Sequence, residues 1–378
     1  RYEPFVPQPS VELAARKTKD IWKAIREKDV LVHHPYETFA TVENFIRTAA
    51  DDDAVLAIKQ TLYRVSSKSP IISALADAAR NGKQVTVLME VKARFDEENN
   101  IIMARRLEEA GCHVIYGILG LKTHSKITMV VRREEDGIRR YCHLATGNYN
   151  GSTAKIYTDI GLMTADNEIG ADGSRFFNFL SGFSDPPAWN KLIVAPLNLR
   201  ETIMAEIDQE IEHAKRGERA YIAAKMNSLL DRLIIAKLYE ASAAGVKIDL
   251  IVRGICVLRP GLPEVSENIH VRSIVGRFLE HSRILYCYNG GREDVFISSA
   301  DWMPRNLNNR VELMIPIREQ DHKNRLHAIL QTYLKDNTKA YLMRSDGSYV
   351  RASCRQGMTP IGAQQTFMET ALSGKTLG

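Results

Sequence analysis

The stretch GLKTHSK at residues 120–126 returns later in the chain as GRFLEHSR at residues 276–283. Its two histidines, His124 and His281, are 281 − 124 = 157 positions apart, far longer than a solenoid repeat. The run GKQVTVLMEV before the first stretch likewise matches GVKIDLIVRG before the second. The sequence therefore predicts a domain that has been duplicated.

Around these stretches, apolar runs of strand length alternate with segments of helical period. In the first half the pattern predicts helices over 11–29, 71–80 and 96–111 and strands over 30–34, 54–65, 84–91, 113–118, 126–133 and 138–146. In the second half it predicts a helix over 228–245 and strands over 218–227, 246–254, 269–276, 283–289 and 294–302. Such alternation is typical of α/β domains, here with mixed sheets because hairpins are included.

The segment SGFSDPPAWN at residues 181–190 is expected to link the halves, because Pro186-Pro187 continues neither a helix nor a sheet. We therefore expect a first domain over residues 1–190, including an N-terminal entry segment, and a second over 191–378. If a pseudo-twofold axis relates the halves, both histidine stretches face one shared cleft.

A cation follows each histidine at the second position along the chain, Lys126 after His124 and Arg283 after His281. Side chains at i and i+2 of a strand project to the same face, so each half presents an imidazole beside a positive charge. An imidazole nitrogen can attack phosphorus, a second histidine can move a proton, and cations can stabilise the phosphate oxygens. A single pair of this kind is usually an ordinary exposed pair, but its duplication favours phosphoryl chemistry.

Composition narrows the class of protein. The 378 residues are 44% hydrophobic, enough for two substantial cores. The net charge of 51 − 46 = +5 does not indicate a dedicated nucleic-acid-binding protein. Five cysteines without CxxC spacing argue against a disulfide scaffold or zinc site and favour the cytoplasm, and no run approaches the ~20 apolar residues that span a membrane. The first residue is Arg rather than Met, so we expect a piece of a longer protein.

The histidine stretches are each followed by a small polar element, ATGNYN at 145–150 and ISSADW at 297–302, and this layout resembles the phospholipase D superfamily. The fuller strings LYRV, EVKARFDEE, GLKTHSK, ATGNYN, YTDIGLMTAD, LIVRG, LEHSR and ISSADWMPRN are similar to the bacterial polyphosphate kinase family of the phosphohistidine type. The resemblance covers nearly the whole chain and matches the two C-terminal catalytic domains of that family. It implies two duplicated phospholipase D-like α/β domains with mixed sheets facing a shared cleft.

The resemblance also implies roles for individual residues. His124 would be the phosphorylated nucleophile, and His281 the second active-site histidine and a nucleotide contact. Tyr157 and Arg253 would contact ATP. Lys126 and Arg283 would complete the cations of the nucleotide site.

Phosphate and Mg²⁺ contacts are implied at Arg64, at the end of one predicted strand, and at Arg94, after the next. Ligands gather at the carboxyl ends of strands in α/β sheets. A guanidinium has no lone pair and Mg²⁺ prefers oxygen, so we expect both arginines to clamp phosphates whose oxygens hold the metal. The plain alternative is a surface salt bridge to Glu97 or Glu98.

The implied activity is the reversible transfer of the terminal phosphate of ATP to inorganic polyphosphate through a phosphohistidine, with Mg²⁺ required. The expected partners are ATP, ADP and polyphosphate, with no nucleic acid, and the full-length protein is expected to be a homo-oligomer. The expected location is the cytoplasm, and peripheral association with the inner membrane is compatible with it.

Two other functions stay open. The chain could be a non-catalytic polyanion-binding fragment if upstream domains complete the nucleotide site. It could also be a phospholipase D-like phosphodiesterase, since the same histidine pair supports hydrolysis. Transfer is favoured over hydrolysis because several arginines suit a polyanion, and because KITMVVRR, the strand that includes Lys126, lacks the acidic residue usual in that superfamily.

Overall fold

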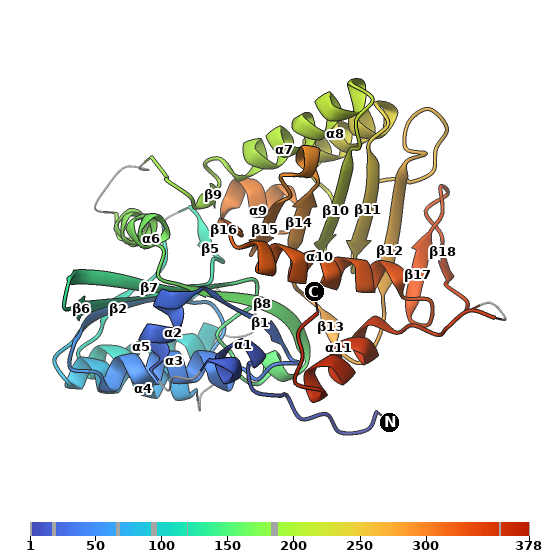
Figure 1. The fold of residues 1–378 in the computed structure, drawn as a ribbon. Helices are drawn as coiled ribbons and strands as arrows, with labels where there is room; N and C mark the ends of the chain where they lie inside the picture. Colours follow the sequence, from blue (N-terminus) through green and yellow to red (C-terminus); the bar gives the residue numbers. More distant parts are fainter. Residues whose placement is uncertain are drawn as a thin grey trace. The chain divides into compact units, whose positions relative to one another are not determined.

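The computed structural model describes residues 2–16, 20–65, 69–91, 97–118, 120–182, 188–354 and 357–377. The chain divides into two compact units. The N-terminal unit comprises Pro7–Ile193 and Asn309–Leu313, and the C-terminal unit comprises Arg1–Val6, Val194–Asn308 and Met314–Gly378. Each unit contains a mixed sheet with helices packed against it (Figure 1), so the predicted α/β class with two mixed sheets is confirmed.

Strands of the N-terminal unit form its central sheet. They are β1 (Val30–His34), β2 (Val55–Leu62), β3 (Gln84–Met89), β4 (His113–Ile115), β6 (Ile127–Glu134), β7 (Gly137–Ala145) and β8 (Tyr157–Thr164), with the short β5 (Lys122–Thr123) apart from them. Their order is β1-β8-β7-β6-β2-β3-β4. The β2, β3 and β4 strands are parallel, and the other neighbours are antiparallel.

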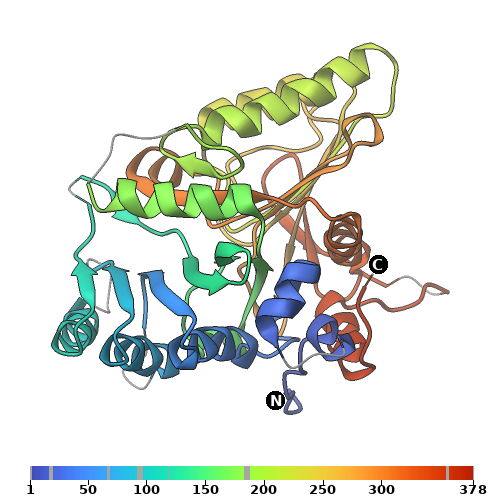
Figure 2. The same ribbon diagram turned by 60° about the vertical axis from the view of Figure 1, so that its left-hand side comes forward.

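Helices cover both faces of this sheet. The helices α3 (Ala40–Asp51), α4 (Pro70–Arg80) and α5 (Glu97–Glu109) lie in a row along one face (Figure 2), where their apolar sides and alternate strand residues form the core. The helix α6 (Asn167–Leu180) packs against β6 and β7 on the other face. The short η1 (Thr153–Lys155) precedes β8.

The single helix predicted over 11–29 is wrong, because this segment forms α1 (Val11–Ala15) and α2 (Ile21–Glu27). Arg16 ends α1 in an extended conformation. Asp20 then caps α2, its carboxylate accepting from two backbone N–H groups of the first turn. A capping aspartate inside an apolar period starts a new helix, which periodicity alone does not reveal. Residues 17–19 lie outside the described residues.

The C-terminal unit is built on the second sheet. Its strands are β10 (Tyr221–Met226), β11 (Lys247–Val252), β12 (Ile269–Ile274), β13 (Leu279–Glu280), β14 (Ile284–Cys287), β15 (Asp294–Ser298), β16 (Arg310–Pro316), β17 (Ala340–Met343) and β18 (Tyr349–Arg351), and β9 (Ile193–Ala195) lies at the boundary between the units. The main order is β18-β17-β12-β11-β10-β14-β15-β16. The first residues of β16 belong to the N-terminal unit, where they pair with β5.

Helices of the C-terminal unit again lie on two faces (Figure 1). The helices α7 (Leu199–Lys215) and α8 (Arg232–Ala243) pack together on one face, and α10 (Gln320–Lys335) packs on the other. The short η2 (Asn289–Gly291) and α9 (Pro304–Asn309) connect strands, and α11 (Ala363–Leu372) follows β18.

The two sheets share one topology. In the N-terminal unit β8-β7-β6-β2-β3-β4 has the same sequence of antiparallel and parallel pairs as β16-β15-β14-β10-β11-β12 in the C-terminal unit. Each histidine stretch precedes the matching strand, β6 or β14. The duplication predicted from the sequence is thus confirmed.

Two further features concern the cysteines and the helices. All five cysteines are free thiols, of which Cys112, Cys142 and Cys287 are buried. Within the described residues, every helix is too short or too polar to cross a bilayer.

Candidate active site

His124 lies just before β6, where its backbone is held against the start of β16. The N–H groups of His124 and Ser125 both donate to the carbonyl of Val311 at 2.9 Å. This pairing brings the next residue, Glu312, to the imidazole, and both of its carboxylate oxygens lie 2.9 Å from His124 Nδ1. Glu312 is fully buried and His124 is 7% exposed. The chain thus supplies a charged partner from 188 positions away.

This carboxylate determines the form of the imidazole. An ionised carboxylate only accepts hydrogen bonds, so the neutral form of His124 carries its proton on Nδ1 and has its lone pair on Nε2. Glu312 also stabilises positive charge that develops on the ring, as in other histidine–carboxylate pairs. An imidazole held in this form can act as a nucleophile through Nε2.

An aromatic ring and several cations surround the same imidazole. Tyr63 directly follows β2, and its ring is perpendicular to that of His124 with centroids 4.9 Å apart. Lys126 Nζ, Lys122 Nζ and the Arg64 guanidinium carbon lie 5.9, 5.8 and 5.8 Å from the Tyr63 centroid. Lys126 is buried and donates to the carbonyl of His124. The structure therefore brings together three residues predicted for the site, His124, Lys126 and Arg64.

His281 and Arg283 form the second centre, in the C-terminal unit. Arg283 Nη1 lies 3.3 Å from Nε2 and 3.4 Å from Nδ1 of His281, and it donates to the His281 carbonyl at 2.8 Å. Both side chains are at least nine-tenths buried. They lie on one face, as their spacing along the chain predicts.

Asp301 binds the other side of Arg283. Arg283 Nε and Nη2 each donate to one carboxylate oxygen of Asp301 at 3.2 Å, a bidentate pair. The Asn227 N–H also donates to Asp301 at 2.8 Å, and the Asn227 side chain donates to the carbonyl of His281 at 3.4 Å. Burial by itself would raise the pKa of Asp301, but Arg283 and these hydrogen bonds outweigh it and hold the pKa below its usual range.

The remaining predicted residues stand at strand ends. Tyr157 is the first residue of β8 and is half-buried. Arg253 directly follows β11, is half-buried, and its N–H donates to the carbonyl of Met226 at 3.2 Å. Arg94 lies outside the described residues.

The described residues near His124 do not form a direct Mg²⁺ site. Mg²⁺ requires oxygen ligands, which the guanidinium of Arg64 cannot supply. Glu312 is engaged with His124, and Glu90 accepts from the N–H of Thr123 at 2.9 Å. Across the part of the chain that the structure describes, no group of three histidine, cysteine or carboxylate side chains could hold a metal ion. The expected contact through phosphate oxygens stays a prediction.

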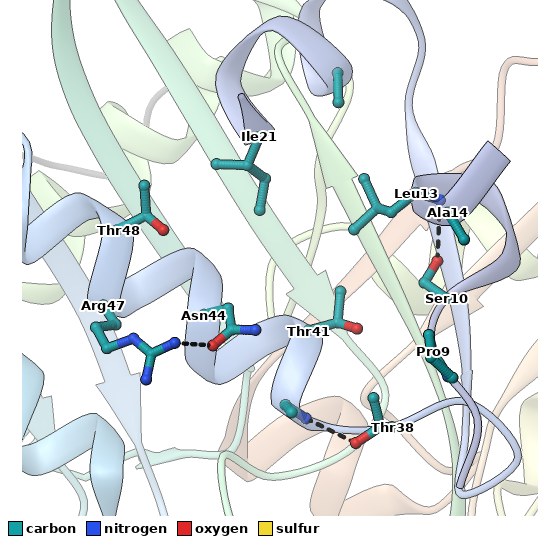
Figure 3. A pocket seen from close by; sticks show the side chains of 12 residues that line it. Pro9, Ser10, Leu13, Ala14, Ile21, Thr38, Thr41, Asn44, Arg47 and Thr48 are labelled. Carbon is teal, nitrogen blue, oxygen red and sulfur yellow. Dashed lines mark hydrogen bonds between the residues drawn. The ribbon is translucent and has the colours of Figure 1, made fainter. Parts of the chain in front are cut away.

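A pocket in the N-terminal unit lies away from this chemistry. Its walls come from α1, α2 and α3 (Figure 3), and its lining comprises Pro9, Ser10, Leu13, Ala14, Ile21, Ala24, Thr38, Ala40, Thr41, Asn44, Arg47 and Thr48. Arg47 donates to the Asn44 side chain at 2.5 Å within it. The lining includes no predicted site residue, so concavity alone does not identify the active site.

Sequence reasoning missed Glu312 and Tyr63. Glu312 sits in the apolar strand RVELMIP, and a carboxylate in such a run is costly to bury without a partner. A carboxylate in this apolar run was therefore the sequence signal for a buried, charged partner. Tyr63 stands within LYRV beside Arg64 but carries no signal of its own.

Comparison with known families matches both halves of the chain. The family model described as polyphosphate kinase C-terminal domain 1 matches residues 20–186, and polyphosphate kinase C-terminal domain 2 matches residues 192–364. The chain is 58% identical over 369 residues to a polyphosphate kinase of Halalkalibacterium halodurans, covering 98% of this chain and 52% of that protein. It is 54% identical over 358 residues to one of Synechocystis sp., covering 94% and 49%. The chain spans about half the length of the curated relatives it matches.

Solved structures agree with these matches. The crystal structure of a polyphosphate kinase from Porphyromonas gingivalis superposes with a TM-score of 0.91 at 40% identity, covering 99% of this chain and 56% of that one. A phosphatidylserine synthase from Haemophilus influenzae superposes with a TM-score of 0.56 at 10% identity, covering 92% and 93%, and so shares the fold alone. The predicted α/β fold with two mixed sheets is confirmed, and this phosphatidylserine synthase shares it. This chain belongs to the polyphosphate kinase family, of which it carries C-terminal domains 1 and 2.

Proposed function

We propose that this chain catalyses the reversible transfer of the terminal phosphate of ATP to inorganic polyphosphate, with His124 as the phosphorylated residue. The observation that carries the proposal is the contact of both Glu312 carboxylate oxygens with His124 Nδ1 at 2.9 Å. It leaves Nε2 with a lone pair and gives the ring a partner for positive charge.

In the first step, the Nε2 lone pair attacks the terminal phosphorus of ATP while the bond to the bridging oxygen breaks and ADP leaves. His124 then carries the phosphoryl group on Nε2 and a proton on Nδ1, so its ring becomes cationic. Glu312 balances that charge in a buried setting, and no proton has to leave the ring.

In the second step, a terminal oxygen of polyphosphate attacks the same phosphorus and the bond to Nε2 breaks. The imidazole returns to its starting form with its proton still on Nδ1. The reverse sequence makes ATP from ADP and polyphosphate, because a phosphorus–nitrogen bond retains a high transfer potential.

The cations would bind and orient the charged substrates. Lys126, beside His124, and Arg283, beside His281, would stabilise the equatorial oxygens of the transferring group. His281 would stabilise that group or move a proton. Tyr157 offers a ring to the adenine and Arg253 a fork to the phosphates.

Arg64 and Arg94 would clamp phosphates, and Mg²⁺ would be carried on the phosphate oxygens of the nucleotide. The proposed location is the cytoplasm, and the proposed assembly of the full-length protein is a homo-oligomer. The proposed location rests on the cysteine content, and the proposed assembly rests on the family.

The test is incubation of the chain with Mg²⁺ and ATP labelled with ³²P at the terminal phosphate. We expect an acid-labile label on the wild-type chain, loss of the label in His124→Ala, and retention in His113→Ala, which changes an exposed histidine of β4. Label that survives His124→Ala would refute the nucleophile.

The same experiment separates the alternatives. A full-length relative, such as that of Halalkalibacterium halodurans, is assayed in parallel. Label on the relative but not on this chain, with polyphosphate retention that weakens with salt, would indicate a non-catalytic polyanion-binding fragment. Release of nucleoside monophosphate from ATP would indicate a phosphodiesterase.

A further inference from the structure

A glutamine from the C-terminal helix α11 holds the backbone just before His281. The N–H of Phe278 donates to Gln364 Oε1 at 2.9 Å, and Gln364 Nε2 donates to the carbonyl of Phe278 at 2.9 Å. The side-chain amide thus pairs with the backbone as a neighbouring strand would. Gly276 makes room for it, because a Cβ there would collide with the Gln364 amide.

The second hydrogen of the same amide enters a buried ionic network. Gln364 Nε2 donates to Glu280 Oε1 at 2.6 Å, and Glu280 Oε2 lies 3.0 Å from Lys225 Nζ. Lys225 also donates to the hydroxyl of Ser282 at 2.9 Å and to its carbonyl at 3.2 Å. Glu280 and Ser282 are the residues on either side of His281, so one network holds both of its neighbours.

The helix that supplies Gln364 is itself firmly placed. Asp336 accepts from the first N–H of α11, that of Ala363, at 2.7 Å. Phe367, one turn beyond Gln364, packs edge-on against Tyr333 of α10 with centroids 5.0 Å apart. Lys225 Nζ lies 5.1 Å from the centroid of that Tyr333 ring. Figure 1 shows α11 beside β13, the strand that precedes His281.

We propose that Gln364 is a positioning residue for His281 in phosphoryl transfer, and that α11 thereby supports the active site. The inference rests on the proposed function. The Gln364 amide makes three hydrogen bonds to the segment 278–280, so the loss of this side chain removes part of the support just before the histidine. Displacement of a reacting group by about 1 Å can slow a reaction up to 100-fold.

The test is Gln364→Leu, compared with the same change at the exposed neighbour Gln365, whose side chain donates to Glu369 at 2.7 Å. Rapid-quench labelling of His124 with ³²P-ATP gives a rate and an amplitude. We expect Gln364→Leu to lower the rate about tenfold or more at unchanged amplitude, and Gln365→Leu to match the wild type. An unchanged rate, or an amplitude that falls in step with the rate, would overturn the inference, since the latter indicates only lost folded protein.

A second variant covers the case in which Gln364→Leu does not fold. Gln364→Glu keeps the size of the side chain but places a carboxylate against Glu280 and removes the donor to the Phe278 carbonyl. Protonation of the new carboxyl restores one donor and removes the repulsion. We therefore expect the labelling rate of this variant, relative to wild type, to recover as pH falls from 8 to 6, and a constant ratio would contradict the inference.

A readout without turnover separates this inference from the proposed function. In protein labelled with ¹³C-histidine, the His281 signal is identified by its loss in His281→Gln. We expect it to shift or broaden in Gln364→Leu and not in Gln365→Leu. If the wild-type chain takes no label but the His281 signal still changes in Gln364→Leu, the proposed function is refuted and the positioning contact stands. If the His281 signal does not change in Gln364→Leu, the positioning role is refuted.

Discussion

The two histidine centres share a topology but place their carboxylates differently. Strand pairing matches Ile127 with Leu144 in one unit and Ile284 with Ile297 in the other, so Asn148 takes the position of Asp301, four residues further on. In the C-terminal unit the carboxylate at that position binds the guanidinium of Arg283. In the N-terminal unit that position is a neutral amide, and the carboxylate comes instead from Glu312 and binds the imidazole.

This difference supports His124 as the proposed carrier of the phosphoryl group. A ring bonded to phosphorus becomes cationic and needs an adjacent negative charge, which Glu312 supplies to His124. At His281 the guanidinium N–H groups approach the ring, and the ion pair with Asp301 fixes them there. Duplication supplied two similar scaffolds, and the position of one carboxylate distinguishes the proposed nucleophile from the proposed phosphate-orienting pair.

Neutralising the two carboxylates in turn is the strongest test of that distinction. We expect Glu312→Gln to slow phosphorylation of His124 by about 100-fold or more, because the amide no longer fixes the proton on Nδ1 or balances the cationic ring. Rapid-quench labelling with ³²P-ATP measures the rate. Asp301→Asn should slow the same step less, and equal losses in the two variants would remove the distinction.

The second prediction concerns the stability of the folded protein. We expect Asp301→Asn to lower the free energy of unfolding by about 3–5 kcal/mol, because the buried charge of Arg283 loses the carboxylate that balances it. Urea denaturation at neutral pH measures it. The control is Asp136→Asn in the surface pair with Arg139, expected to cost under about 1 kcal/mol. Similar losses in the two variants would show that the Arg283 pair behaves as a surface pair.

Much of this comparison was accessible from the sequence. The repeat in the sequence identified the two histidines and the cations beside them. The strand matching that relates Asn148 to Asp301 follows from the same alternation of apolar runs. Glu312 was not accessible, because its contact depends on β16 pairing with β5, a two-residue strand 188 positions from its partner. Gln364 is hidden for the same reason, since its partners lie 84 and 86 positions away. Long-range pairing of short segments leaves no periodic trace.

The aromatic neighbour of His124 provides a smaller test. Strand pairing places Tyr63, after β2, where Asn227 stands after β10 in the other unit. We expect Tyr63→Leu to slow labelling of His124 about fivefold, because the perpendicular ring and its contact with Lys126 are lost. Tyr63→Phe keeps the ring and should stay near wild type. A rate as low for Tyr63→Phe as for Tyr63→Leu would transfer the role to the hydroxyl.

The smallest expected effect concerns another buried carboxyl of the C-terminal unit, Glu206 on α7. Burial, together with the neighbouring Asp294, raises its pKa to about 7. The folded state therefore holds a proton that the unfolded chain releases near its ordinary pKa of about 4.5. The stabilisation is present below that value and is lost as pH rises through about 7. We expect Glu206→Gln to flatten the fall in unfolding free energy between pH 5 and 8, measured by urea denaturation.

Asp301 is the useful comparison for Glu206, because it is also buried but has the guanidinium of Arg283 beside it. The pKa of Asp301 is held below its usual range, so its contribution is present at all pH values above the unfolded pKa and is lost only in acid. Asp301 therefore adds no slope between pH 5 and 8, and Glu206 does. Glu201→Gln, an exposed change on the same helix, should leave the slope unchanged. A wild-type slope in Glu206→Gln would mean that Arg292, which opposes the shift, already keeps Glu206 ionised in the folded protein.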